Sequence, residues 1–259
     1  MYFGAKNINV SYGKELVLKN ISCPIEKGKT TAIIGVNGSG KSTLLKALGR
    51  LIKFDGTVEF DEKPLSNLTN MEIARKIALL PQSVQAPTDI TVYELVGLGR
   101  FPYQRLTQRS LSDKDKEFVM EIMKETNVWD FRNEKVANLS GGQRQRVFIT
   151  LTLAQDSEII LLDEPTTYLD MSHQLDILTL LKNFAEKRHK TVVYVIHDLN
   201  QVARFADNLI ILKNGELFDQ GKTADLFTEK TLFESFGLNV SIGCDTFTQS
   251  LMITGVKNG

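Results

Sequence analysis

The spacing of apolar residues among polar ones changes along the chain, and these changes divide the chain into regions. Over residues 2–34 and 56–61 the apolar residues come in short strand-length pieces, which predicts a β-rich lobe. From Gln82 to about Ala154 the period becomes helical. Within this stretch, residues 113–126 carry an apolar stripe among charges and predict one helix with a buried face.

After residue 155 the pattern alternates between strands and helices. Ile159–Asp163 and Val192–Ile196 are apolar strand-length runs, and Leu175–Phe184 between them is helical in period. This alternation predicts a parallel sheet with helical crossovers. Ile210–Phe218 contains an Asn-Gly pair between apolar runs, which predicts a hairpin. The chain is therefore expected to have an α/β core into which a helical segment is inserted.

A phosphate-binding loop is predicted at Gly35-Val36-Asn37-Gly38-Ser39-Gly40-Lys41-Ser42-Thr43, between the apolar run Thr31–Ile34 and a helix that continues from Leu44. Glycines let backbone N–H groups approach phosphate oxygens, and the helix N-terminus adds its dipole. A lysine in this position reaches the β- and γ-phosphates, and the following hydroxyl ligates Mg²⁺. A glycine-rich turn that merely begins an ordinary helix is the simpler alternative.

Three further segments carry polar groups at the ends of predicted elements. Leu139-Ser140-Gly141-Gly142-Gln143 opens a helix with two glycines after a serine and has no lysine, so it makes a second anion-ready helix N-terminus. The strand Ile159–Leu162 leads to Asp163 and Glu164. Because strand side chains alternate, one carboxylate can face Mg²⁺ while the other faces an attacking water. His197 follows the strand Val192–Ile196, where an imidazole can reach a γ-phosphate.

These segments together resemble the ATP-binding subunit of ABC transporters, over about residues 2–240. The resemblance implies an α/β fold with a P-loop NTPase core, in which a RecA-like parallel sheet and an antiparallel β lobe carry an inserted α-helical subdomain. It places the core and lobe at residues 2–84 and 156–222, the helical subdomain at 85–155, and a C-terminal extension at 223–259.

The resemblance also assigns roles to residues in this sequence. It implies ATP and Mg²⁺ as cofactors, with Glu164 as the catalytic base and Lys41, Gln82 and His197 as further catalytic residues. Mg²⁺ would be held by Ser42, Gln82 and Asp163. The nucleotide-binding residues would be Tyr12, which stacks on adenine, with Gly35, Asn37, Gly38, Ser39, Gly40, Lys41, Ser42, Thr43, Ser140, Gly141, Gly142, Gln143 and Asp170.

Composition limits the partners. The formal net charge is zero, which gives no bulk attraction to nucleic acid. Cys23 and Cys244 lie far apart without metal-ligand spacing, which favours a reduced cytoplasmic protein. No apolar stretch approaches the ~18 residues of a membrane span. If the protein acts at a membrane, we therefore expect it to do so by binding permease subunits, as a peripheral protein at the cytoplasmic face.

Leu139–Gln143 matches the signature motif of the family and is called the signature segment below. In the family, each signature motif completes the nucleotide site of a second copy, head to tail, so the resemblance implies a symmetric dimer with ATP in its interface. The segments Val92–Tyr103, Asp163–Asp170 and Leu232–Leu238 are similar to those of the subfamily that imports ferric siderophores, haem and cobalamin. A ferric siderophore is the expected cargo, supplied indirectly by a substrate-binding protein. Import of haem, cobalamin or another small cargo, a soluble non-transport ABC ATPase and a P-loop kinase are the alternatives.

Three expectations concern single side chains outside the motifs. Arg100 and Tyr103 are expected to be exposed on the surface that receives a cytoplasmic helix of the permease. His173 and His189 lie on helix-like segments and are expected to have no partners. Arg144 and Arg146, two apart on a helix, point in different directions and could serve the dimer face or nothing.

Overall fold

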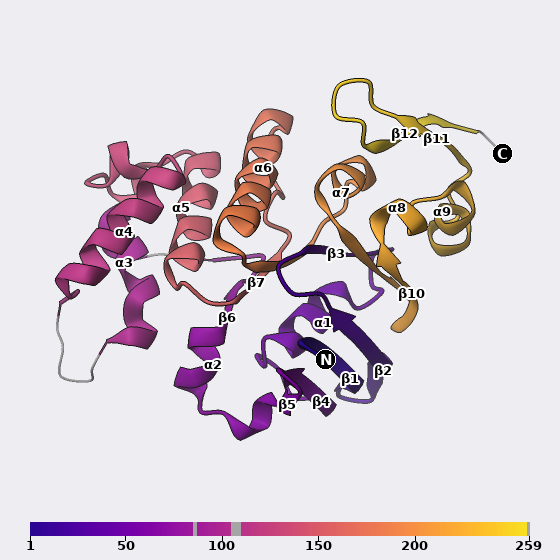
Figure 1. Cartoon of the computed structure of the whole chain (residues 1–259), viewed down its shortest axis with the longest axis horizontal. Helices are drawn as coiled ribbons and strands as arrows, with labels where there is room; N and C mark the ends of the chain where they lie inside the picture. Colours follow the sequence, from indigo (N-terminus) through magenta and orange to yellow (C-terminus); the bar gives the residue numbers. More distant parts are fainter. Residues whose placement is uncertain (85–86, 105–109, 258–259) are drawn as a thin grey trace. The chain divides into compact units, whose positions relative to one another are not determined.

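The computed structural model describes residues 1–84, 87–104 and 110–257 (Figure 1). They group into two compact units, the first formed by residues 1–68 and 182–259 and the second by residues 69–181. The chain passes from the second unit back to the first within α6 (Met171–Arg188). The predicted helical subdomain and C-terminal extension include residues 85, 86, 105–109, 258 and 259, which lie outside the described ranges.

The predicted antiparallel lobe is present in the first unit as a sheet with strand order β2-β1-β4-β5. Along β1, Phe3, Ile8 and Val10 are buried, so one face of the sheet is apolar. The helix α1 (Lys41–Leu48) contacts β1 and β2. The strands of this sheet are β1 (Phe3–Tyr12), β2 (Glu15–Ile25), β4 (Asp55–Phe60) and β5 (Lys63–Pro64).

The centre of the first unit is a sheet in the order β10-β9-β3-β8, in which β9, β3 and β8 are parallel and β10 pairs antiparallel with β9. The strand β3 pairs in parallel with β8 on one side and β9 on the other. All of β8 is buried, as expected for a strand covered on both faces. The Asn214-Gly215 turn, with positive φ at both residues, joins β9 to β10 and confirms the predicted hairpin. The strands are β3 (Thr30–Gly35), β8 (Thr191–Val195), β9 (Asn208–Lys213) and β10 (Glu216–Lys222).

The second unit combines a parallel strand pair, β6 (Ile77–Leu80) with β7 (Ile159–Asp163), and a group of helices. Three of these helices, α3, α4 and α5, pack against one another (Figure 1). The helix predicted over residues 113–126 is α4, and its Val119, Ile122 and Met123 are fully buried. The described helical elements of the second unit before α6 are α2 (Asn70–Lys76), α3 (Val92–Gly97), α4 (Asp113–Glu125) and α5 (Gly141–Ala154), with the 3₁₀ segments η2 (Leu98–Tyr103), η3 (Trp129–Phe131) and η4 (Val136–Asn138).

Two helices of the second unit, α2 and α3, begin with a capping box whose sequence pattern is Thr-x-x-Glu. The Thr69 hydroxyl accepts from the backbone N–H of Glu72, whose carboxylate accepts from the Thr69 N–H, and Thr91 with Glu94 does the same for α3. These hydrogen bonds hold the pKa of Glu72 and of Glu94 below the ordinary value. Each cap satisfies two N–H groups that a helix start otherwise leaves unpaired.

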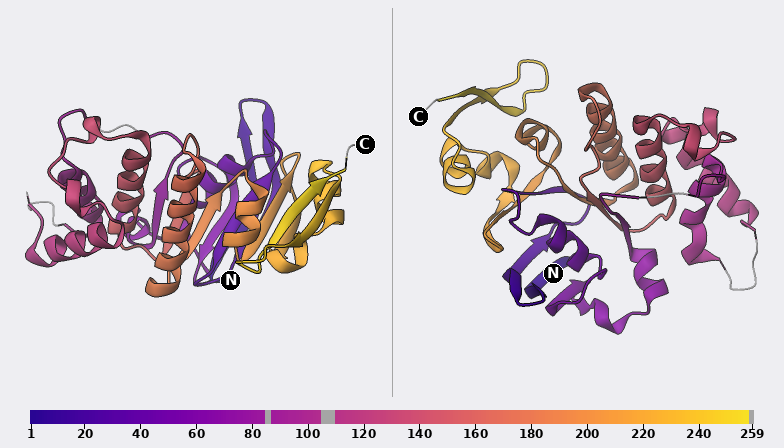
Figure 2. Two further views of the ribbon diagram at one scale, coloured as in Figure 1. Left: turned by 90° about the horizontal axis from the view of Figure 1, so that it is seen from above. Right: turned by 180° about the vertical axis from the view of Figure 1, so that it is seen from behind.

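The C-terminal segment packs on α7 (Leu199–Phe205), the helix that follows His197. It consists of α8 (Thr223–Leu226), α9 (Glu229–Phe236) and the antiparallel pair β11 (Val240–Cys244) and β12 (Leu251–Val256), drawn in yellow in Figure 2. The Ile253 N–H donates to Asn200 Oδ1 at 2.8 Å, which ties β12 to the first turn of α7. Among the residues that the structure describes, none of the helices has the length and apolarity to cross a membrane.

Candidate functional site

The predicted phosphate loop joins β3 to α1 and depends on backbone conformations that favour glycine. Gly38 and Gly40 have φ of 78° and 98°. A Cβ at Gly35 would lie 2.3 Å from the Leu212 carbonyl oxygen and 2.6 Å from Ser39 Oγ, and one at Gly40 would lie 2.5 Å from a Leu18 methyl. Gly35 and Gly40 therefore exclude larger residues on steric grounds, whereas position 38 favours glycine through its backbone conformation alone.

Two polar side chains of this loop, Lys41 and Ser39, are buried. Lys41 is only 6% exposed, and its Nζ donates to the carbonyls of Gly35 and Val36 at 3.0 Å each. Ser39 Oγ is buried and has no hydrogen-bond partner within the described ranges. Asn37 and Gly38 are exposed, while Ser42 and Thr43 are half-buried in the first turn of α1. An ammonium, an unsatisfied hydroxyl and loop amides in one short segment fit the oxygens of a phosphate.

His197 lies at the same edge of the first unit's sheet as this loop. In the register of the neighbouring parallel strands, Ile33 pairs with Val195. Gly35 and His197 therefore each follow a paired residue by two positions, and both lie at the carboxyl ends of their strands. His197 is exposed there, which leaves its imidazole accessible to a ligand at this edge.

The corresponding edge of the second unit brings together Gln82 and Glu164. Leu80 of β6 pairs with Leu162 of β7, so these two side chains also follow paired residues by two positions. Gln82 Nε2 donates to Glu164 Oε2 at 2.9 Å, and the Thr167 hydroxyl donates to the same oxygen at 2.8 Å. Two donors on one oxygen orient this carboxylate. Asp163, the last residue of β7, is 1% exposed and so differs in environment from its neighbour, as the alternation predicts.

Glu164 also has an unusual backbone. Its φ is 52°, in the left-handed region that L-residues other than glycine, asparagine and aspartate rarely adopt. Tyr168, four residues on, has φ of 65° and a side chain that is 97% exposed. Such conformations cost on the order of 1–3 kcal/mol each and are concentrated at functional sites.

The signature segment begins α5 with a third capping box. The Ser140 hydroxyl accepts from the Gln143 N–H, and the Gln143 side-chain oxygen accepts from the Ser140 N–H at 3.0 Å. The Ser-x-x-Gln spacing announces this cap, which the sequence reasoning missed. Gly141 faces open space, because a Cβ there would have no neighbour within 4 Å. The cap fixes the side chains of Ser140 and Gln143, and the backbone of Gly141 stays open to a ligand.

Asp170 directly precedes α6, and its side chain contacts His173, a histidine that was expected to have no partner. Asp170 Oδ1 accepts from the His173 N–H at 3.0 Å, and His173 Nδ1 lies 2.8 Å from both Asp170 carboxylate oxygens. Ser172 Oγ also donates to Asp170 at 3.0 Å. The expectation for His173 was therefore wrong, because its partner lies one helical turn earlier in the same cap. His189, the other such histidine, lies exposed at the far end of α6.

A pH titration is expected to report this cap. The backbone N–H and the ring of His173, with Ser172, lower the pKa of Asp170 from 3.8 to about 2. A carboxyl with a depressed native pKa stabilises the fold above its unfolded pKa and loses that contribution as the pH falls toward the native one. The stabilisation should therefore be complete above about pH 4 and vanish toward pH 2. A ¹³C NMR titration of the Asp170 carboxyl measures this, and a midpoint near 4 would contradict it.

Arg100 was expected on the exposed surface, but it is buried. The residue is 8% exposed, Nε lies 2.8 Å from Asp115 Oδ1, and Nη1 donates to the Ala154 carbonyl at 2.9 Å. Its guanidinium lies 4.1 Å from the centre of the Tyr103 ring and 4.6 Å from that of Phe118. The pKa of Asp115 is raised by burial, but hydrogen bonds from Ser112 and Arg100 bring it below its ordinary value. Arg100 thus ties η2 to α4 and to the end of α5.

Tyr103 is half-buried under this arginine, so neither side chain is the free surface group that the sequence suggested. The exposed large side chains of η2 are instead Leu98, at 55%, and Phe101, at 61%. Arg144 Nη2 donates to the Ala137 and Leu139 carbonyls, and Arg146 lies 3.4 Å from Asp176 on α6. Both arginines therefore have partners within the chain.

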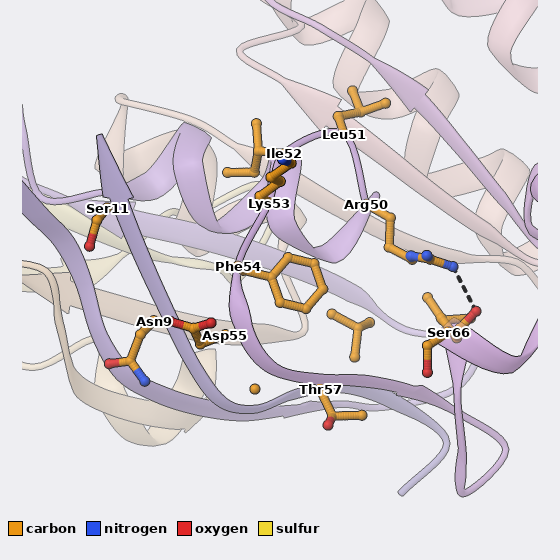
Figure 3. A pocket seen from close by; sticks show the side chains of 13 residues that line it. Asn9, Ser11, Arg50, Leu51, Ile52, Lys53, Phe54, Asp55, Thr57 and Ser66 are labelled. Atoms are coloured by element: carbon orange, nitrogen blue, oxygen red, sulfur yellow. Dashed lines mark hydrogen bonds between the residues drawn. The ribbon is translucent and has the colours of Figure 1, made fainter. Parts of the chain in front are cut away.

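Tyr12 is the last residue of β1 and is 51% exposed, opposite Glu15. A pocket of about 760 Å³ opens beside the same strand (Figure 3). Two of its polar side chains have partners within the chain: Arg50 donates to the Leu65 carbonyl at 2.7 Å, and Asn9 hydrogen-bonds to the Asn7 carbonyl and the Asn20 N–H. No phosphate-loop residue lines it, so this pocket is separate from the candidate site.

Comparisons with known proteins agree with this geometry. A family model described as ABC transporter matches residues 18–167. The petrobactin import ATP-binding protein FpuD of Bacillus anthracis is 43% identical over 93% of this chain and 88% of its own length. The ferric enterobactin transport ATP-binding protein FepC of Escherichia coli is 42% identical over 92% and 88%, respectively.

Among solved structures, a dimeric ATP-binding cassette in a post-hydrolysis state with ADP and Pi is 35% identical to this chain. It aligns with a TM-score of 0.73 over 85% of this chain and 98% of its own. The phosphate loop, the paired strand ends and the signature helix thus occur in a chain whose sequence and fold both match one family. The chain belongs to the ABC transporter family, as an ATP-binding and ATP-hydrolysing subunit.

Proposed function

We propose that this chain hydrolyses ATP to drive the import of a ferric siderophore through a membrane permease. The observation that carries the ATPase is the oriented carboxylate of Glu164, which receives hydrogen bonds from Gln82 and Thr167 at the end of a buried strand. The cargo class rests on the relatives, whose names speak of petrobactin import and ferric enterobactin transport. The fold by itself does not select the cargo.

The nucleotide is assigned to the first unit's loop. Lys41 and the loop amides neutralise the phosphates, and Ser39 Oγ gains an acceptor that it lacks among the described residues. On ATP binding, Lys41 Nζ exchanges its loop carbonyl partners for phosphate oxygens. Tyr12, exposed at the end of β1, stacks on the adenine. Asn37 and Thr43 complete the cradle from the exposed loop and the first turn of α1.

The residues present also fit Mg²⁺, which prefers oxygen ligands and is usually bound by one or two carboxylates with waters and substrate phosphates. We assign Ser42 Oγ, the buried Asp163 carboxylate and the Gln82 amide oxygen to it. The ion supplies charge neutralisation on the phosphates.

Hydrolysis then requires an oriented water and a held γ-phosphate. Glu164 accepts the proton of the attacking water, and the donors on its Oε2 direct the other oxygen, Oε1, toward that water. His197, at the carboxyl edge of β8, donates to the γ-phosphate. Gln82 bonds to the base itself, so it is placed to sense whether the γ-phosphate is present.

The site is completed by a second copy of the chain. The matching cassette is described as dimeric, and this chain carries one phosphate loop and one signature helix. In a head-to-tail dimer, the amides of Gly141 and Gly142 contact the nucleotide held by the partner's loop. The subunit then works at the cytoplasmic face of the membrane, and the exposed Leu98 and Phe101 of η2 contact the permease.

Mixed mutants test this arrangement. Lys41→Ala removes the phosphate-loop cation, and Ser140→Arg places a bulky cation at the signature helix, so each variant alone should lose nearly all ATPase activity. An equal mixture should recover roughly a quarter of the wild-type rate, because half of the dimers are mixed and one of their two sites is intact. Steady-state ATPase assays on titrated mixtures measure it. Mixtures that never exceed the separate variants would exclude the composite site.

The cargo is tested separately, in proteoliposomes that contain the permease and its binding protein. Ferric siderophore uptake that depends on ATP and stops with Lys41→Ala supports the proposal. Uptake of haem or cobalamin in place of the ferric siderophore would identify another member of the same importer class. ATPase activity with no transport of any of these would favour the non-transport alternative.

A further inference from the structure

The His173 side chain contacts both Asp170 and the signature segment, two parts of the second unit that are far apart in sequence. His173 lies in the first turn of α6 with a side chain that is 46% exposed. Its Nδ1 lies 2.8 Å from the Asp170 carboxylate oxygens, which hold one edge of the ring. The other edge faces Gly142, the second glycine of the signature segment. A Cβ at Gly142 would lie 3.0 Å from Cδ2 and 3.4 Å from both Cγ and Nε2 of the ring.

This contact makes the two signature glycines different. Gly141 faces open space, so its missing side chain leaves the backbone accessible. At Gly142 a side chain would instead press against an imidazole, whose nearest carbon would lie 3.0 Å from the added Cβ. The Asp170 carboxylate holds that imidazole, and Asp170 is itself fixed as the cap of α6.

A second contact holds the same two segments together. Gln145, three residues beyond Gly142 on α5, donates its Nε2 to the Pro165 carbonyl at 2.9 Å. Pro165 follows Glu164 directly, and Gln174 Nε2 donates to the Leu169 carbonyl at 2.9 Å. The segment from Glu164 to Asp170 is therefore attached to α5 at its start by Gln145 and at its end through His173.

We propose that His173 is a positioning residue of the ATP site: held by Asp170, its imidazole is the surface on which Gly142 packs, and it fixes the start of α5 relative to the Glu164–Asp170 segment. This inference rests on the proposed function, because it concerns the composite site formed by two copies. The start of α5 acts on the partner's nucleotide, and the Glu164–Asp170 segment acts on the chain's own. His173 thus links the two nucleotides of one dimer.

The expected effect of His173→Ala lies in the closed dimer and not in nucleotide binding by the single subunit. Loss of the ring loosens a helix start whose contacts form only when two copies close on ATP. The ATPase kcat should fall about tenfold, in the range that small misplacements cause. The affinity of the monomer for a fluorescent ATP analogue should stay within twofold, because the phosphate loop is untouched. In the Glu164→Gln background, half-maximal ATP-dependent dimerisation should require about tenfold more protein.

Two substitutions separate this role from a loss of stability. His173→Gln keeps a donor for Asp170 and carbons over Gly142, and it should recover kcat to within about threefold of wild type. His189→Asn changes another exposed histidine at the opposite end of α6, at a φ of 52° that asparagine tolerates, and should have wild-type activity. Thermal unfolding of all variants identifies any that are simply unstable.

A double-mutant cycle tests the contact itself. Gly142→Ala should lower kcat because the new methyl group displaces the ring, and part of that loss should disappear when His173 is already alanine. Losses that multiply, or His173→Ala with wild-type kcat and dimerisation, would overturn the proposal. A wild-type chain that neither hydrolyses ATP nor forms the Glu164→Gln dimer would overturn the proposed function instead.

Discussion

Glu164→Gln is expected to lower the ATPase rate by about 10²–10⁴, which is the usual contribution of a general base, and to leave ATP affinity nearly unchanged. The amide keeps the shape of the carboxylate and its contacts with Gln82 and Thr167, but it cannot accept the proton of the attacking water. With hydrolysis blocked, ATP should hold two copies together. Steady-state kinetics and size-exclusion chromatography in Mg-ATP measure the two effects.

Glu158→Gln is a matched control, because Glu158 directly precedes β7 at the end opposite Glu164 and its ion pair with Lys76, at 3.4 Å, lies at the surface. It should hydrolyse ATP at the wild-type rate, since isolated surface pairs contribute little. A Glu164→Gln variant that hydrolyses ATP at the wild-type rate would show that Glu164 is not the general base. One that stays monomeric with ATP would contradict the trapped dimer.

Arg100→Glu is expected to destabilise the second unit by about 3–5 kcal/mol, because it leaves the Asp115 carboxylate buried without its cation and adds a like charge beside it. The Ala154 carbonyl would also lose its donor. ATPase activity should fall with the folded fraction, and urea unfolding followed by circular dichroism measures the loss.

Phe101→Asp is the control within the same 3₁₀ segment. Its side chain is 61% exposed, so the substitution should change stability by no more than about 0.5 kcal/mol and leave basal ATPase activity intact. Uptake in proteoliposomes should fall, since this residue lies on the proposed permease surface. An Arg100→Glu variant as stable as wild type would show that the buried ion pair contributes nothing to the fold.

The parts that could be predicted from sequence are those fixed by residues close in the chain. The phosphate loop requires glycines, a lysine and a hydroxyl within nine positions, and the acidic pair follows directly on its strand, so both are visible locally. The order of the strands around β3 cannot be predicted in this local way, because β8 and β9 lie more than 150 residues further along the chain. The division of the chain at residues 85 and 155 stays a prediction.

The errors have the same physical origin. Arg100 follows Gly-Leu-Gly, a local sequence that suggests an exposed residue. It is buried because its guanidinium binds Asp115 and the Ala154 carbonyl, which lies 54 residues away. The His173 ring lies against a glycine 31 positions earlier. The Ser140 cap is different, because the Ser-x-x-Gln spacing that predicts it lies within four neighbouring residues. The same residues also predict an anion site, and the cap was not among the expectations.

The left-handed backbone of Glu164 has an evolutionary consequence. Glycine, asparagine and aspartate adopt φ near 52° with less strain than glutamate does, and each of them removes or shortens the catalytic carboxylate. A substitution at this position that relieves the backbone strain therefore also removes or misplaces the catalytic carboxylate. Selection for stability and selection for turnover oppose each other at this one residue, and a lineage that no longer needs the ATPase should lose glutamate here early.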